Sequence, residues 1–185
     1  MSRCTLLVAS LLCATLVGCT PTVQGAWREE VELGDGRIIL IQRTITWQEV
    51  QAWGQTKMYG VRETTVTIPR DSRQAASPPW RGRQESALLL DFDVERQEYV
   101  LVTLPDTCVR YGEAGRPRPP YLEYALHNGE WTMIALDTKL IGRRANLIVY
   151  PRVAREPPLI TASEKAERQT SPQLNIVATG GLAGC

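Results

Sequence analysis

The stretch Tyr121-Leu122-Glu123-Tyr124-Ala125-Leu126-His127-Asn128-Gly129-Glu130-Trp131-Thr132-Met133-Ile134-Ala135-Leu136 carries the clearest local signal in the chain. Two runs of alternating apolar residues flank the pair Asn128-Gly129. Asn-Gly readily adopts the positive φ angles of a tight turn between antiparallel strands. The sequence therefore predicts a β-hairpin over 121–136.

Two further hairpins are predicted outward from this stretch. The first covers 27–47 and turns at Gly34-Asp35-Gly36, and the second covers 87–104 and turns at Glu95-Arg96. Alternation places Leu88, Leu90, Phe92 and Val94 on one face of the second hairpin. In the first hairpin one strand face is apolar except for Arg43, and this face consists of Ile39, Ile41, Arg43, Ile45 and Trp47. Single strands are predicted over 61–68, 145–150 and 174–178.

The remaining segments are expected to be loops, with one exception. The polar stretch 70–83 has no periodicity, and the prolines of 115–120 favour an extended polyproline II segment. The exception is Thr161-Ala162-Ser163-Glu164, whose capping-box spacing predicts a short helix to about residue 170. Together these features predict a mainly β domain, an antiparallel sandwich or a partly open barrel with a short C-terminal helix.

The first 19 residues have a different character. Arg3 and the amino terminus supply positive charge, and 6–17 is an apolar run of 12 residues. A membrane-spanning helix needs about 20 apolar residues, so this run suits the apolar region of a signal peptide. It ends in Leu16-Val17-Gly18-Cys19, which resembles the lipobox of bacterial lipoproteins.

The lipobox resemblance implies a diacylglycerol on the Cys19 sulfur, cleavage before Cys19 and acylation of the freed amine. It divides the chain into a lipoprotein signal peptide (1–18), a lipid-anchored tether (19–25) and a single β-rich domain (26–185). Because each buried methylene contributes about 0.8 kcal/mol, several acyl chains would hold the domain at a bacterial membrane, facing the periplasm. Thr20 follows the cysteine, and in enteric-type sorting a non-acidic residue there favours the outer membrane over the inner one.

The charge of the chain bears on its possible partners. The chain has 21 basic and 20 acidic side chains, and only Arg3 lies in the signal peptide, so the mature domain is balanced. Nucleic-acid binding depends on clustered positive charge, so no nucleic-acid partner is expected.

Cys108 and Cys185 would remain as an even pair in an oxidising compartment. Either they form a disulfide, or Cys108 is buried and Cys185 is a loose terminal thiol.

A second resemblance covers roughly 27–169. The elements Val31-Glu32-Leu33, Thr65-Val66-Thr67-Ile68-Pro69, Gly115-Arg116-Pro117-Arg118-Pro119-Pro120-Tyr121, Gly129-Glu130-Trp131 and Asn146-Leu147-Ile148 resemble an uncharacterised family of proteobacterial exported proteins. That family typically shows a Gly-Arg-Pro-x-Pro-Pro-Tyr segment shortly after a cysteine, which Cys108 matches. The resemblance implies export and no particular activity.

Candidate catalytic chemistry is sparse. The only histidine, His127, lies beside a turn, and no Cys, His or carboxylate cluster has zinc spacing, so neither a metal nor a cofactor is predicted. Asp91 and Asp93 alternate on one strand face and could act as an acid–base pair. Alternatively, they form the solvated face of that strand.

The segment with Arg116, Arg118 and Tyr121 is a candidate interaction loop, because arginine and tyrosine are frequent in binding hot spots. The alternative is a rigid connection that returns the chain to the sheet. We therefore expect a non-enzymatic envelope module whose partners are membrane lipid, through acylated Cys19, and an envelope protein or cell-wall polymer. The rival expectations are a membrane-anchored hydrolase using Asp91 and Asp93, and a purely structural lipoprotein.

Overall fold

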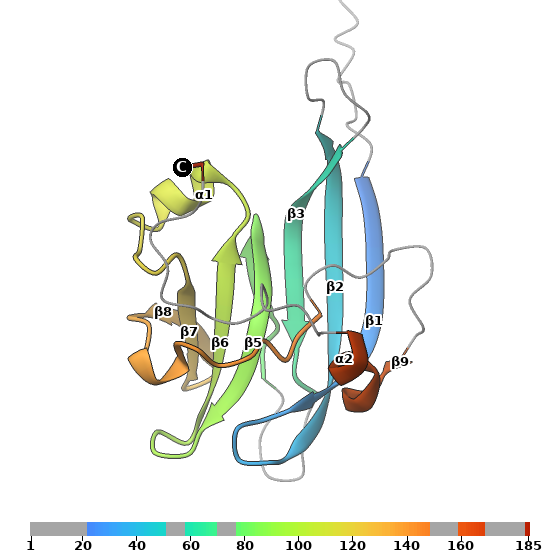
Figure 1. Cartoon of the computed structure of the whole chain (residues 1–185), viewed down its shortest axis with the longest axis vertical. Helices are drawn as coiled ribbons and strands as arrows, with labels where there is room; N and C mark the ends of the chain where they lie inside the picture. Colours follow the sequence, from blue (N-terminus) through green and yellow to red (C-terminus); the bar gives the residue numbers. More distant parts are fainter. Residues whose placement is uncertain (1–21, 51–57, 70–76, 149–158, 169–183) are drawn as a thin grey trace, which may run out of the picture.

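The computed structural model describes residues 22–50, 58–69, 77–148, 159–168 and 184–185, and in this part of the chain nine strands form two sheets (Figure 1). The first sheet has the order β4-β3-β2-β1-β9, and the second has the order β5-β6-β7-β8. The strands of the first sheet are β1 (Thr22–Glu32), β2 (Ile38–Val50), β3 (Met58–Thr67), β4 (Trp80–Arg83) and β9 (Leu159–Ile160). Those of the second are β5 (Glu85–Asp93), β6 (Glu98–Pro105), β7 (Leu122–His127) and β8 (Glu130–Ile134).

The predicted fold class is confirmed. Neighbouring strands pair antiparallel except for β1 and β9, which are parallel, and the sheets do not close into a barrel. The β7–β8 hairpin turns at Asn128 and Gly129, whose φ angles are 50° and 80°. These are the positive values for which the Asn-Gly pair is suited.

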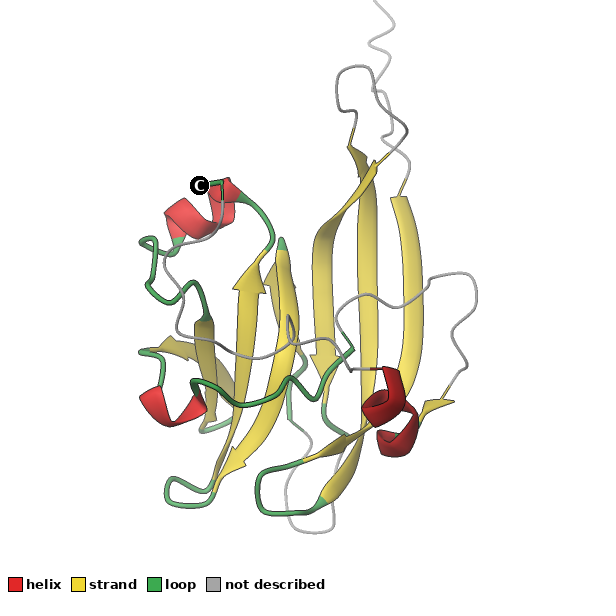
Figure 2. Ribbon diagram, in the orientation of Figure 1, coloured by secondary structure: helices red, strands yellow, loops and turns green. Residues whose placement is uncertain are grey.

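In the described ranges, three short helices lie beside the sheets (Figure 2). They are α1 (Cys108–Glu113), the 3-10 helix η1 (Thr138–Leu140) and α2 (Ala162–Arg168). The capping box predicted for α2 is present, because the Thr161 N–H donates to Glu164 Oε2 at 2.7 Å and the Glu164 N–H donates to Thr161 Oγ1 at 3.3 Å. No helix in the described ranges is long and apolar enough to cross a membrane.

The two sheets are joined where β4 passes into β5. Gln84, with φ of 54°, separates the two strands and turns the chain from one sheet into the other. The Gln84 N–H donates to the Arg62 carbonyl at 3.1 Å, and Thr64 Oγ1 donates to the Glu85 carbonyl at 2.8 Å. These contacts hold β3 of the first sheet against β5 of the second.

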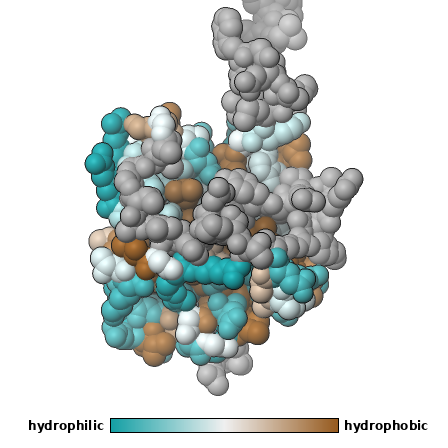
Figure 3. Space-filling view, in the orientation of Figure 1, coloured by the Kyte–Doolittle hydropathy of each residue, from teal (hydrophilic) through white to brown (hydrophobic). Residues whose placement is uncertain are grey.

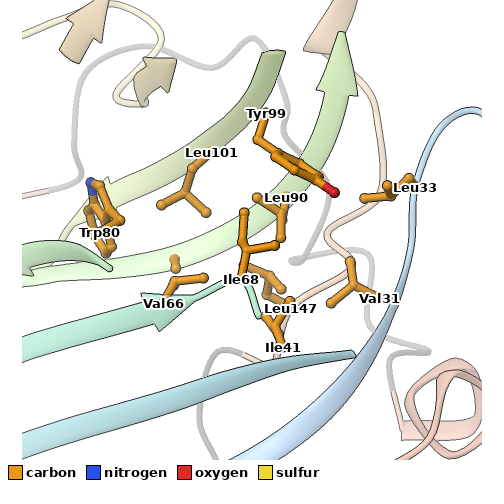
Figure 4. Close-up of a cluster of buried hydrophobic side chains, with 11 residues drawn as sticks. Val31, Leu33, Ile41, Val66, Ile68, Trp80, Leu90, Tyr99, Leu101 and Leu147 are labelled. Carbon is orange, nitrogen blue, oxygen red and sulfur yellow. The ribbon is translucent and has the colours of Figure 1, made fainter. Parts of the chain in front are cut away.

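A shared apolar core fills the space between the sheets (Figure 4). The first sheet contributes Ile41 and Val66, the second contributes Leu90 and Leu101, and all four are buried. Trp80 packs edge-on against Tyr124 at 5.4 Å between ring centroids. The largest side chain of the core therefore bridges the two sheets.

Gly82 makes room for that tryptophan. A Cβ atom at Gly82 would come within 2.1 Å of the Trp80 indole, so no larger residue fits unless the ring moves. The sequence suggested a polar loop over 70–83, and this was wrong for 80–83, which form β4. Pairing with β3 and burial of Trp80 create this strand, and neither is visible in the local pattern.

The N-terminal boundary of the domain also needs correction. The predicted tether ran to residue 25, whereas β1 begins at Thr22 and pairs in continuous register from Thr22↔Gln48 to Glu32↔Ile38. The long β2 strand supplies partners for residues 22–25, which have little strand signal of their own. Fewer residues therefore separate Cys19 from the domain than the sequence suggested.

Three further expectations change in the middle of the chain. Residues 108–113 form α1, and 145–148 do not form the predicted strand. A bulge between Ala87 and Leu89 shifts the register of β5, so Leu88 packs with Leu89 and Val102 rather than with Leu90. The predicted strand 174–178 lies outside the described residues.

Candidate functional site

The predicted interaction loop follows α1. We call residues 115–120 the arginine–proline loop. Gly115 and Arg116 have φ angles of 82° and 54°, and the Tyr111 hydroxyl donates to the Pro117 carbonyl at 3.0 Å. The loop is therefore a turn fixed to α1, and the prediction of extended polyproline II was wrong at its first two residues.

Two of the three residues predicted for this surface are exposed. Arg116 and Arg118 reach solvent, while Tyr121 is 9% exposed and packs with Leu88 and Val102. The proposal that Tyr121 belongs to an interaction surface therefore needs correction, because its ring is part of the core. Its burial is caused by contacts with β5 and β6, which the local sequence does not reveal.

A groove lies beside the arginine–proline loop, between it and the chain that follows β8. Its volume is about 510 Å³, and it is lined mainly by apolar side chains, among them Pro117, Pro119, Met133, Leu136 and Ile141. Arg118 is the one charged residue among the described residues of its lining, and Met133 is 53% exposed. We call this feature the loop groove. It combines an apolar floor with a cationic rim.

A disulfide joins Cys108 to Cys185. Cys108 is the first residue of α1, just after Thr107, whose hydroxyl accepts a hydrogen bond from the Arg110 N–H at 3.1 Å. The covalent link therefore fixes the C-terminal residue to the helix that carries the arginine–proline loop. Cys19, the predicted lipidation residue, lies outside the described residues.

Asp91 connects three parts of the chain. Its Oδ1 accepts hydrogen bonds from the N–H groups of Gly34 at 2.6 Å and Phe92 at 2.9 Å, and its Oδ2 pairs with Arg143. The carboxylate is buried beneath the segment that follows η1. Asp91 thus fastens the β1–β2 turn and that segment to β5, and the suggested solvated face was wrong at this position.

Asp93 and His127 lie at strand ends. Asp93 Oδ1 accepts from the N–H groups of Glu95 and Arg96, at 2.9 Å and 3.0 Å, in the turn between β5 and β6. His127 contacts the Glu98 carboxylate across β6 and β7. The structure therefore gives Asp91 and Asp93 separate sets of partners. Groups of three or more Cys, His, Asp or Glu that could hold a metal ion do not occur among the described residues.

A buried carboxylate cluster lies at the junction of the sheets. Glu85 accepts hydrogen bonds from Arg110 Nε at 2.6 Å, Thr103 Oγ1 at 2.7 Å and the Tyr124 hydroxyl at 3.0 Å. Burial, together with the charge of Glu85, raises the pKa of Asp106 to about 6, although a hydrogen bond from Ser86 opposes the change. This cluster fastens α1 to the second sheet.

A second buried cluster crosses the inner face of the first sheet. Arg43 Nη1 lies 3.0 Å from Glu29 Oε1, and Lys165 Nζ of α2 lies 3.5 Å from Glu29 Oε2. Exposure is 0% for Glu29, 1% for Arg43 and 4% for Lys165. Two buried cations therefore share one buried carboxylate.

Several donors in this second cluster lack acceptors. Arg43 Nε, Arg43 Nη2 and Trp27 Nε1 are buried with no hydrogen-bond partner in the described part of the chain, and the Arg43 guanidinium lies over the Trp27 ring at 5.2 Å. This cluster was not predicted from the sequence. The available signal was Arg43, the one charged residue on an apolar strand face.

Comparisons with known proteins leave the chain's identity open. No family model, curated protein or solved structure matches it. The two resemblances carried by the lipobox and by the proline segment therefore stay predictions.

Proposed function

We propose that this chain is a lipid-anchored protein of the bacterial envelope, held by acylated Cys19 with its domain facing the periplasm, and more specifically at the outer membrane. The observation that carries this proposal is Leu16-Val17-Gly18-Cys19 at the end of a 12-residue apolar run. The Cys108–Cys185 disulfide supports it, because disulfides persist in the oxidising periplasm and are rare in the cytosol.

The domain, in this proposal, is a non-enzymatic binding module. The loop groove supports this role. It has a volume of about 510 Å³, and its lining is mainly apolar with a charged group at the rim, as is typical of binding sites. Arg116 and Arg118 supply two exposed cations beside it, and arginine is enriched among residues that dominate binding energy. The partner is an envelope protein or a cell-wall polymer that presents negative charge next to an apolar segment.

The rival proposal, a membrane-anchored hydrolase using Asp91 and Asp93, has weaker support. The two carboxylates accept hydrogen bonds from different turns, and Asp91 is neutralised by Arg143. A general acid–base pair needs both groups within reach of one substrate atom. The contacts described here favour structural roles for both.

The anchor has a direct test. We expect mass spectrometry of the protein purified from its membrane to find Cys19 as the acylated N-terminal residue. The Cys19→Ser variant should yield no acylated mature form, because serine lacks the sulfur to which the diacylglycerol is attached. A bare Cys19 terminus in the native protein, or a normally matured and membrane-bound Cys19→Ser protein, would exclude the anchor.

The binding surface is tested separately. We expect the double variant Arg116→Ala with Arg118→Ala to lose at least tenfold in recovered partner when the lipidated protein is cross-linked in cells and purified. Co-purifying proteins are quantified by mass spectrometry, and cell-wall polymer by its muramic acid content. The matched control is Arg28→Ala with Arg62→Ala, which removes the same charge from exposed positions on the first sheet. Equal recovery from both double variants would show that the loop is only a connection.

A further inference from the structure

A second pocket, separate from the loop groove, is lined by residues of α2. Figure 1 shows α2 beside the first sheet, away from α1 and η1. The pocket has a volume of about 410 Å³ and opens between the β1–β2 turn, residues 143–146 and α2. We call it the Lys165 pocket. Figure 3 shows strongly hydrophilic residues across the middle of this face, where residues 141–148 pass in front of the second sheet.

Cations dominate the polar lining of the Lys165 pocket. Arg143, Arg144 and Lys165 line it, and Glu32 is the one acidic residue that the described ranges contribute to the lining. Arg143 is paired with Asp91. Arg144 is exposed and forms no ion pair with any residue in the described ranges, so its positive charge is available to a ligand.

Lys165 connects the pocket to the buried cluster of the first sheet. Its ammonium donates to the Asn146 carbonyl at 2.6 Å and lies 3.5 Å from Glu29 Oε2. Lysine has three N–H donors, so one remains without an acceptor among the described residues. Burial lowers the pKa of Lys165, although the Glu29 charge opposes this change. Among the described residues, the Lys165 ammonium shares the Glu29 carboxylate with Arg43 and can still donate one more hydrogen bond.

Two buried cations beside the pocket share one buried carboxylate. In the buried cluster behind the pocket, Arg43 and Lys165 carry two positive charges and share the buried carboxylate of Glu29. In the lining, Arg143 is paired with Asp91. The half-buried Glu30 carboxylate partly offsets the Lys165 charge as well, and it accepts a hydrogen bond from the Ala162 N–H of α2 at 3.1 Å. Buried charges in proteins are normally paired, because an unpaired buried charge is costly. A negative charge placed in the pocket would give Lys165 a counter-charge that it does not share with Arg43.

The rest of the lining sets the size of the ligand. Leu33, Leu89 and Ala145 form buried apolar walls, and Ala162 and Ala166 of α2 add small side chains. A volume near 410 Å³ is at the lower end of the range for small-molecule sites. It suits a compact ligand with one charged end and a short apolar or neutral body.

We propose that the Lys165 pocket binds a small phosphate-bearing ligand, with Lys165 and Arg144 contacting its phosphate. Guanidinium and ammonium groups are the usual protein partners of phosphate oxygens. The same chemistry is presented by a free phosphate ester and by the glycerophosphate headgroup of a lipid. This site is separate from the loop groove and does not depend on what the groove binds.

The test titrates the full-length lipidated protein, in nonionic detergent, with sn-glycerol 3-phosphate at constant ionic strength. We expect saturable binding by calorimetry and a rise in melting temperature of at least 3 °C at saturation, whereas sodium chloride should give neither. Arg144→Gln should weaken binding at least tenfold. The matched control is Arg62→Gln, which removes an exposed arginine from β3 and should bind as the wild type does.

Lys165→Met separates ligand binding from structural support. The variant should lose binding while its unliganded melting temperature equals or exceeds that of the wild type, because it removes the excess buried charge. If Lys165 serves only to neutralise Glu29, the variant will be less stable and will still bind, and this result would overturn the proposal. Absence of saturable binding to the wild type, or equal weakening by Arg144→Gln and Arg62→Gln, would also overturn it.

Mixed micelles of phosphatidylglycerol identify the source of the phosphate. Competition between these micelles and sn-glycerol 3-phosphate, lost in Arg144→Gln, assigns a lipid headgroup. Binding of the soluble ester without competition from the micelles assigns a free phosphate ester. Each of these two results supports the phosphate site.

Discussion

Replacing Glu29 with glutamine is expected to destabilise the domain by about 4 kcal/mol, because it leaves Arg43 and Lys165 buried without a counter-charge. Removing one partner of a buried ion pair typically costs about 3–5 kcal/mol, since the remaining charge has lost its hydration and gains nothing in return. Glutamine keeps the shape of the side chain, so the loss measures charge rather than packing. Urea denaturation at pH 7 gives the free energy of unfolding.

Two comparisons make the Glu29 result specific. Glu63→Gln breaks an exposed pair with Arg81 and should cost at most about 1 kcal/mol. The triple variant Glu29→Leu, Arg43→Met and Lys165→Met should lie within about 2 kcal/mol of the wild type, because apolar residues of similar volume often replace buried ion pairs without loss. Equal costs for Glu29→Gln and Glu63→Gln would mean that the buried cluster contributes little.

Removal of the disulfide is the second large effect. The variant Cys108→Ser with Cys185→Ser is expected to lose about 4 kcal/mol, because a link between residues 77 positions apart restricts the unfolded chain strongly. The measurement is denaturation of the wild type with and without a reducing agent, beside the double variant. Reduced wild type and double variant should unfold together. A double variant as stable as the oxidised wild type would show that the link contributes no stability.

The hairpins were the part of the fold that local sequence could predict. Asn128-Gly129 and Asp35-Gly36 lie at observed turns, and Gly36 has a φ of 82°. Turn chemistry acts over four or five residues, so it is visible without knowledge of the fold. The capping box of Thr161 and Glu164 is local in the same way.

The missed elements depend on distant partners. β4 exists because Trp80 to Arg83 pair with β3 and because Trp80 fills the space between the sheets. In the region of the expected strand at 145–150, the Asn146 side chain instead bonds the Leu90 N–H and carbonyl of β5 at 2.9 Å and 2.7 Å. Because the hydrogen bonds to the edge of β5 come from one side chain rather than from the backbone of a strand, no alternating apolar pattern in the sequence indicates them.

The buried ion pairs, too, could be predicted from the sequence only where their partners are close together in the chain. Glu29 and Arg43 are near neighbours once the Asp35-Gly36 turn fixes the register, since Glu29 pairs with Ile41 and Trp27 pairs with Arg43. This contact was therefore within reach of the sequence. Lys165 joins them from α2, more than a hundred residues later, and only the folded chain brings it there. Asp91 was noticed for its spacing, but its partner Arg143 was not predictable.

The early start of β1 limits how far an anchored domain could reach. Three peptide units separate Cys19 from Thr22. If Cys19 is acylated, the fully extended linker between the lipid-bearing residue and β1 is therefore about 10 Å long. The distance from the bilayer that the protein could reach would then depend mainly on the length of the domain itself. Strand β1 alone spans about 35 Å at the usual rise per residue. Any partner would have to approach within one domain length of the bilayer, which favours other residents of that membrane and the nearest layer of the wall.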